Sequence, residues 1–171
     1  TISAALANTP TRLVAVSKTR SIAEIMALYQ QGQRLFGENK VQELLEKQPG
    51  LPSDIEWHLI GHLQSNKVKY IAPFVSMIHS VDSVKLLFEI NKEAAKNKRI
   101  IKVLIQIHLA QEETKFGADE KELIEILEYY TAANSTLTHV CIAGLMGMAT
   151  NTDDEDRKST RLNSSHRLTS R

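Results

Sequence analysis

The chain has 171 residues, of which 42% are hydrophobic and 24% charged, and this composition is that of a soluble globular protein. It is long enough for one ordinary domain but short of the ~250 residues that a complete eight-stranded α/β barrel needs. No apolar run approaches the ~18 residues of a membrane span, and the first residues lack a secretory signal pattern. The single cysteine, Cys141, excludes an intrachain disulfide bond, and we therefore expect a cytoplasmic protein.

The formal net charge of +1 hides an uneven distribution of charge. Five of the 21 Lys and Arg side chains lie in residues 157–171, which contain no Asp or Glu. The rest of the chain is therefore mildly acidic. It lacks the clustered basic side chains that neutralise phosphates, so we expect no nucleic-acid partner.

Short apolar, β-branched runs alternate along the chain with amphipathic segments of helical period. This alternation predicts βαβ units around a parallel sheet. Runs such as Val103-Leu104-Ile105 have no polar alternation, which is typical of strands covered on both faces. The predicted strands span residues 13–17, 34–37, 56–60, 75–80, 102–109 and 138–144.

Three helix starts carry N-cap signals. Ser21 with Glu24 and Asp119 with Glu122 have the spacing of capping boxes, and Ser83 can cap a third helix. Two shorter helices are predicted in the gaps that follow the second and third strands. Together with the strands, these helices predict repeated β/α units.

Lys18 is the best single candidate for chemistry. It follows the first predicted strand, at the end of a parallel sheet that faces ligands in α/β folds. Apolar neighbours there would disfavour the ammonium form and leave a neutral amine that can attack an aldehyde. The competing interpretation is a lysine that extends from a strand end into solvent, and without further context the residues favour it.

A metal site is the competing hypothesis for the histidines that follow the third strand. His58 and His62 lie on either side of a strand end that contains Gly61, and no carboxylate or cysteine accompanies them nearby. Because a metal ion needs more ligands than two imidazoles, we predict no metal site.

Five motifs occur in a fixed order between residues 11 and 154, and in this order they resemble the YggS/PROSC family. This is the family of pyridoxal 5′-phosphate (PLP) homeostasis proteins. The resemblance implies an α/β fold, the TIM barrel of the alanine racemase N-terminal-domain type (PLP fold-type III), here with only about six β/α units. The motifs are Val14-Ala15-Val16-Ser17-Lys18-Thr19, Phe36-Gly37-Glu38-Asn39 followed by Val41-Gln42-Glu43, Trp57-His58-Leu59-Ile60-Gly61-His62-Leu63-Gln64-Ser65-Asn66-Lys67, His79-Ser80-Val81-Asp82 and Gly144-Leu145-Met146.

The resemblance also implies a function and three site residues. Lys18 matches the lysine that holds PLP as a Schiff base, and Asn39 and His58 match polar residues that line the mouth of the cofactor site. The implied function is PLP binding in intracellular vitamin B6 homeostasis, without catalytic turnover. PLP-dependent apo-enzymes are the implied protein partners, and the family is mostly monomeric. The alternatives are a PLP-dependent racemase or decarboxylase of the same fold, and a lyase that uses Lys18 on substrate carbonyls.

The chain departs from the family after its sixth strand. The family's later Ser-Met-Gly-Met-Ser and Arg-Ile-Gly motifs, which supply the phosphate-binding amides and an arginine near the pyridine ring, do not occur. We therefore interpret residues 1–154 as a partial PLP-binding barrel. Residues 155–171 form a basic tail that resembles a translated sequencing adapter. We expect such an open barrel to be marginally stable, prone to aggregation and a poor PLP binder despite Lys18.

Overall fold

A computed structural model of the protein describes residues 6, 8–108 and 117–147. Its strands form a six-stranded sheet in which each strand pairs in parallel with the next one along the chain. The strands are β1 (Ala15–Val16), β2 (Leu35–Glu38), β3 (Glu56–Leu59), β4 (Met77–Val81), β5 (Ile101–Ile107) and β6 (Val140–Gly147).

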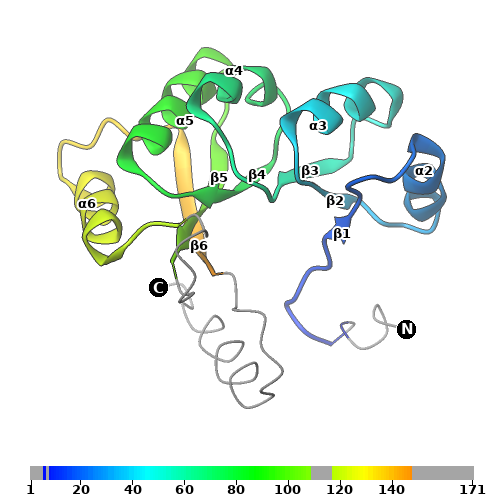
Figure 1. Cartoon of the computed structure of the whole chain (residues 1–171), viewed down its shortest axis with the longest axis horizontal. Coiled ribbons are helices and arrows are strands. Elements are labelled where there is room, and N and C mark those ends of the chain that lie inside the picture. The colour runs from blue at the N-terminus through cyan, green and yellow to red at the C-terminus, as the bar shows by residue number, and fades with distance from the viewer. Residues whose placement is uncertain (1–5, 7, 109–116, 148–171) are drawn as a thin grey trace.

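Helical segments connect the strands. They are α2 (Ile22–Gln30), α3 (Val41–Lys47), the 3₁₀ turns η1 (Gln48–Gly50) and η2 (Ser65–Lys67), α4 (Val68–Ile71), α5 (Val84–Lys96) and α6 (Glu120–Thr131). The α-helices follow one side of the curved sheet (Figure 1). Sequential parallel strands with helices on one side form the wall of an α/β barrel, whereas a doubly wound sheet has helices on both sides. The predicted fold class is therefore confirmed for the described residues.

All six predicted strands are present, but their ends differ from the prediction. The first strand shrinks to Ala15–Val16, because β1 has only β2 as a neighbour and pairs with it at two positions. The last strand extends to Gly147, because β6 pairs with β5 as far as Ile107. Residue 109 of the predicted fifth strand and residues 148–171 lie outside the described residues.

The predicted helix caps are present. Ser21 and Glu24 form a capping box before α2, and Asp119 and Glu122 form another before α6. The Ser83 hydroxyl accepts a hydrogen bond from the backbone N–H of Leu86 at the start of α5. Each cap satisfies backbone donors that a helix start leaves without a partner.

The hydrophobic core lies between the sheet and the row of helices. Phe36 pairs in register with Trp57, and Leu59 with Ile78, and these four side chains are buried with apolar residues of the helices. The alternate strand positions face the other side of the sheet, where Val16 is 52% exposed. The expectation that the strands are covered on both faces therefore fails for β1, whereas all four residues of β2 are buried and agree with it. None of the described helices is both long and apolar enough to cross a bilayer.

Candidate functional site

The carboxyl ends of β1, β2 and β3 bring the predicted site residues to one edge of the sheet. The register aligns Val16, Gly37 and His58 across the three strands. Lys18 comes two residues after Val16, and Asn39 comes two residues after Gly37, so both lie at the carboxyl edge of the sheet. His58 belongs to the aligned row itself and lies further inside. The structure therefore brings Lys18 and Asn39 to neighbouring strand ends and places His58 deeper on the sheet.

Lys18 lies in a turn that begins one residue after the end of β1, and its side chain is exposed. The wall of apolar neighbours that the sequence suggested is not formed by the described residues. The turn is nevertheless well defined by hydrogen bonds. The Ser17 backbone N–H donates to the Gly37 carbonyl oxygen at 2.9 Å, and the Arg20 N–H donates to the Ser17 carbonyl oxygen at 3.0 Å. The amine of Lys18 is thus presented to solvent from a hydrogen-bonded turn.

Asn39 packs against the end of the neighbouring strand. A side chain on Gly61 would collide with the backbone carbonyl and the side-chain oxygen of Asn39. The Gly61 carbonyl oxygen in turn accepts a hydrogen bond from the buried Ser80 hydroxyl at 2.6 Å. Gly61 is therefore required for the close approach between the ends of β2 and β3. The sequence motif contained Gly61, but the sequence alone did not indicate this role.

His58 forms a close contact with a second histidine. The Nδ1 atom of His58 lies 2.9 Å from the Nε2 atom of His79, which projects from β4. Burial, followed by the neighbouring His79, lowers the pKa of His58 to about 4. Burial also lowers the pKa of His79. Both rings are neutral at neutral pH, so one nitrogen donates the shared proton and the other accepts it.

The sequence did not assign a role to His79, although the motif His79-Ser80-Val81-Asp82 contained it. The available signal was that His79 is a polar residue in an apolar strand. It lies on the face of β4 opposite to the buried Ile78 and Ser80. Its partner could not be deduced, because the contact depends on the register of two strands.

His62 lies apart from the histidine pair. Its Nδ1 atom is 3.7 Å from a carboxylate oxygen of Asp82, whereas His58 contacts His79. Within residues 6, 8–108 and 117–147, no group of three or more His, Cys, Asp or Glu side chains could hold a metal ion.

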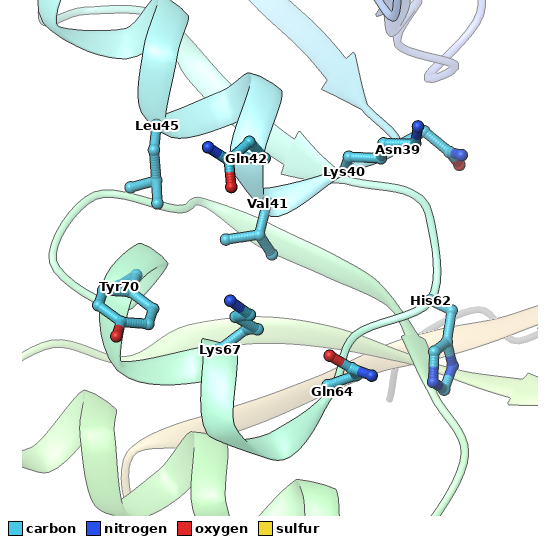
Figure 2. Close-up of a pocket in the computed structure, with 9 residues that line it drawn as sticks. All are labelled: Asn39, Lys40, Val41, Gln42, Leu45, His62, Gln64, Lys67 and Tyr70. Atoms are coloured by element: carbon cyan, nitrogen blue, oxygen red, sulfur yellow. The ribbon is translucent and has the colours of Figure 1, made fainter.

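A surface groove of about 360 Å³ opens between α3 and the segment from His62 to Tyr70. Asn39 and His62 lie at one end of this groove, and Leu45 and Tyr70 lie at the other (Figure 2). Lys18 does not line the groove. Of the three predicted site residues, Asn39 alone lines this groove.

A family model described as "Alanine racemase, N-terminal domain" matches residues 1–170. The chain belongs to this family. The parallel sheet in sequential order, with helices on one side, agrees with this assignment. The predicted membership of a PLP-related barrel family is thereby confirmed.

Curated relatives give a more specific comparison. The pyridoxal phosphate homeostasis protein of Haemophilus influenzae is 38% identical over 146 residues, which cover 84% of this chain and 60% of that protein. The protein of the same name from Aquifex aeolicus is 43% identical over 136 residues, covering 79% of this chain and 58% of the relative. The human protein of that name is 42% identical over 144 residues, which cover 79% of this chain and 51% of the human protein. The chain thus spans little more than half the length of these relatives.

Solved structures share the fold. PipY of Synechococcus elongatus, described with PLP bound, is 34% identical with a TM-score of 0.82, covering 96% of this chain and 76% of that one. Alanine racemase from Bartonella henselae has a TM-score of 0.64 at 18% identity, and the match covers 94% of this chain and 46% of the racemase. This second likeness concerns the fold alone.

Proposed function

We propose that the chain binds PLP through Lys18, which forms a Schiff base with the aldehyde of the cofactor. The observation that carries the proposal is the exposed Lys18 amine on a hydrogen-bonded turn at the carboxyl edge of the sheet. The 34% identity to PipY, which is described with PLP bound, supports the same ligand.

The residues present fit an aldehyde ligand. The Lys18 amine in its neutral form adds to the aldehyde carbon, a C=N bond forms and one water molecule leaves. The step involves no change in oxidation state, and water reverses it. Exposure of the turn allows the cofactor to arrive and to leave. PLP itself supplies the electrophilic carbonyl group.

Asn39 and His58 supply polar groups beside the lysine. The exposed Asn39 amide lies at the next strand end, where it can donate or accept a hydrogen bond. The neutral His58–His79 pair places uncharged imidazoles on the inner side of the sheet. We propose Asn39 as a direct contact of the ligand. We propose His58, through its contact with His79, as part of the surface beneath it.

The proposed role is that of a carrier that buffers PLP in the cytoplasm, without turnover. The names of the curated relatives, pyridoxal phosphate homeostasis proteins, support this role over that of a racemase. A reversible Schiff base suits a carrier, because the cofactor can be passed on by hydrolysis or by exchange with another amine. PLP-dependent apo-enzymes are the proposed recipients.

The test is a titration with PLP followed by the visible absorption band of the Schiff base. We expect the band for the wild-type chain and for Lys85→Ala, a control at an exposed lysine on α5, and its loss in Lys18→Ala. Borohydride reduction and peptide mass analysis should place the pyridoxyl group on Lys18. A band of full strength in Lys18→Ala would contradict the proposal, and racemisation of added L-alanine would favour the enzyme instead.

A further inference from the structure

Three charged side chains lie against the turn that carries Lys18. Glu38 at the end of β2 is fully buried, and the side chains of Lys47 and Glu43 on α3 are 11% and 23% exposed. Charged groups are seldom placed in such positions unless they are paired, because burial removes their hydration. Within the motif Phe36-Gly37-Glu38-Asn39, Glu38 has no part in the site described so far, and neither does the Glu43 that follows the motif.

The ammonium group of Lys47 uses all three of its donors within this cluster. It donates to Glu38 Oε1 at 2.8 Å, to Glu43 Oε2 at 3.1 Å and to the backbone carbonyl oxygen of Ser17 at 2.9 Å. An ammonium group has three N–H donors and no acceptor, so this arrangement satisfies it completely. The third bond ties helix α3 to the residue that precedes Lys18.

The two carboxylates also hold the turn. Glu38 Oε1 accepts a hydrogen bond from the Ser17 hydroxyl at 2.7 Å. Glu43 Oε2 accepts one from the backbone N–H of Thr19 at 2.9 Å. The residues immediately before and after Lys18 are therefore both bound to the same cluster of charged side chains.

The backbone of the turn needs such support. Thr19 has a φ of 62°, in the left-handed region that residues other than glycine seldom adopt. The bond from its N–H to Glu43 offsets part of that cost. The pKa of Glu43 is lowered by this backbone hydrogen bond first and by Lys47 second, which is consistent with a charged acceptor.

We propose that Glu38, Glu43 and Lys47 are positioning residues for Lys18. They hold the backbone on both sides of Lys18, through the Ser17 carbonyl oxygen and the Thr19 N–H. This inference rests on the proposed function of Lys18. The physical basis of the positioning effect is conformational entropy. A lysine on a turn that is already fixed loses less backbone entropy on binding a ligand that other residues also hold, so the ligand binds more tightly.

Glu43 offers the cleanest test, because its side chain is partly exposed and its loss leaves the Lys47–Glu38 ion pair in place. In Glu43→Ala we expect faster hydrogen exchange at the Thr19 amide and about tenfold weaker PLP binding, the size expected from releasing roughly one backbone residue. Glu43→Gln retains an oxygen that can accept the Thr19 N–H and should recover most of the affinity. Glu46→Ala, at an exposed residue of the same helix, is the matched control.

A second measurement separates positioning from a purely structural role. Reductive methylation of the Lys18 amine by formaldehyde and cyanoborohydride needs an accessible amine and no second contact to hold the reagent. Its rate should therefore be the same in wild type and Glu43→Ala. If wild type and Glu43→Ala bind PLP equally, or if the Thr19 amide exchanges equally in both, the positioning role is wrong while the function of Lys18 stands. If the wild-type chain forms no PLP adduct on Lys18, the proposed function fails and this inference fails with it.

Discussion

The contact between His58 and His79 depends on the number of protons that the two rings carry. With a separation of 2.9 Å between Nδ1 and Nε2, one nitrogen must donate and the other must accept. Two protonated rings would offer no acceptor and would repel each other. Burial keeps both rings neutral, and the pKa of His58 lies at about 4. Protonation of this pair is therefore expected to make the stability of the protein depend on pH.

We expect the free energy of unfolding to fall as the pH decreases from about 6.5 to about 4. The folded pKa of His58 is below that of an unfolded histidine, so the unfolded chain binds the proton first. The stabilisation is complete above the unfolded pKa and decreases by roughly 3 kcal/mol across this window. Urea unfolding followed by the fluorescence of Trp57, the single tryptophan, measures it at each pH.

The variant that tests this role is His58→Gln, in which the decrease in stability should be smaller than in wild type. Parallel curves for wild type and His58→Gln would contradict the role given to this residue.

Single residues also show the limits of sequence reasoning. Lys18 could be selected from its place after an apolar strand together with the family motifs. The exposure of Lys18 agrees with the competing interpretation of a lysine that extends into solvent, which the residues alone favoured. The partner of His58 was missed because the contact depends on strand register and His79 is 21 residues away along the chain.

At the level of elements, the ends of β2 and β3 approach each other more closely than side chains normally allow. Gly61 makes this approach possible, because the position of a Cβ atom there would overlap the Asn39 backbone. The obstacle is main chain, which moves less easily than the end of a side chain. The packing of these two strand ends therefore sets the position of Asn39.

Gly61→Ala should destabilise the protein by about 1–3 kcal/mol, because the added methyl group must displace the Asn39 backbone. Gly50→Ala is a suitable control, since its methyl group would meet only the flexible end of the Ile22 side chain. Urea midpoints compare the two variants. Equal midpoints for wild type and Gly61→Ala would show that this approach is not a constraint.

The starts of the helices were predicted more accurately than the ends of the strands. A capping box such as Ser21 with Glu24 is complete within four residues, so local sequence is sufficient to recognise it. The extent of β1 depends on pairing with β2, and that of β6 on pairing with β5. These partners are distant in the chain, so local patterns left those boundaries open.

At the level of the whole molecule, a single core connects the described elements. Buried side chains of α2, α3, α4, α5 and α6 belong to one cluster with those of the sheet. Trp57 in β3 and Ile126 in α6 are both members of it, although 69 positions separate them in the sequence. One continuous core is expected to unfold in a single cooperative step.

Ile126→Ala should therefore lower the free energy of unfolding by roughly 2–5 kcal/mol, as the removal of a fully buried isoleucine usually does. The transition seen by Trp57 fluorescence and that seen by far-UV circular dichroism should shift together. Ile124→Ala, at a position on the same helix that is 49% exposed, is the control and should change little. A Trp57 transition that does not shift in Ile126→Ala would show that α6 unfolds separately.

Strand and helix positions, the family and the choice of Lys18 followed from the amino-acid sequence, because apolar periodicity, caps and motifs are local properties of the chain. The tertiary structure alone decided that His58 contacts His79 and that Lys47 joins α3 to Ser17. Each of these depends on strand register and on helices packing beside strands. Such contacts join residues that are 21 or 30 positions apart. No local pattern contains that information.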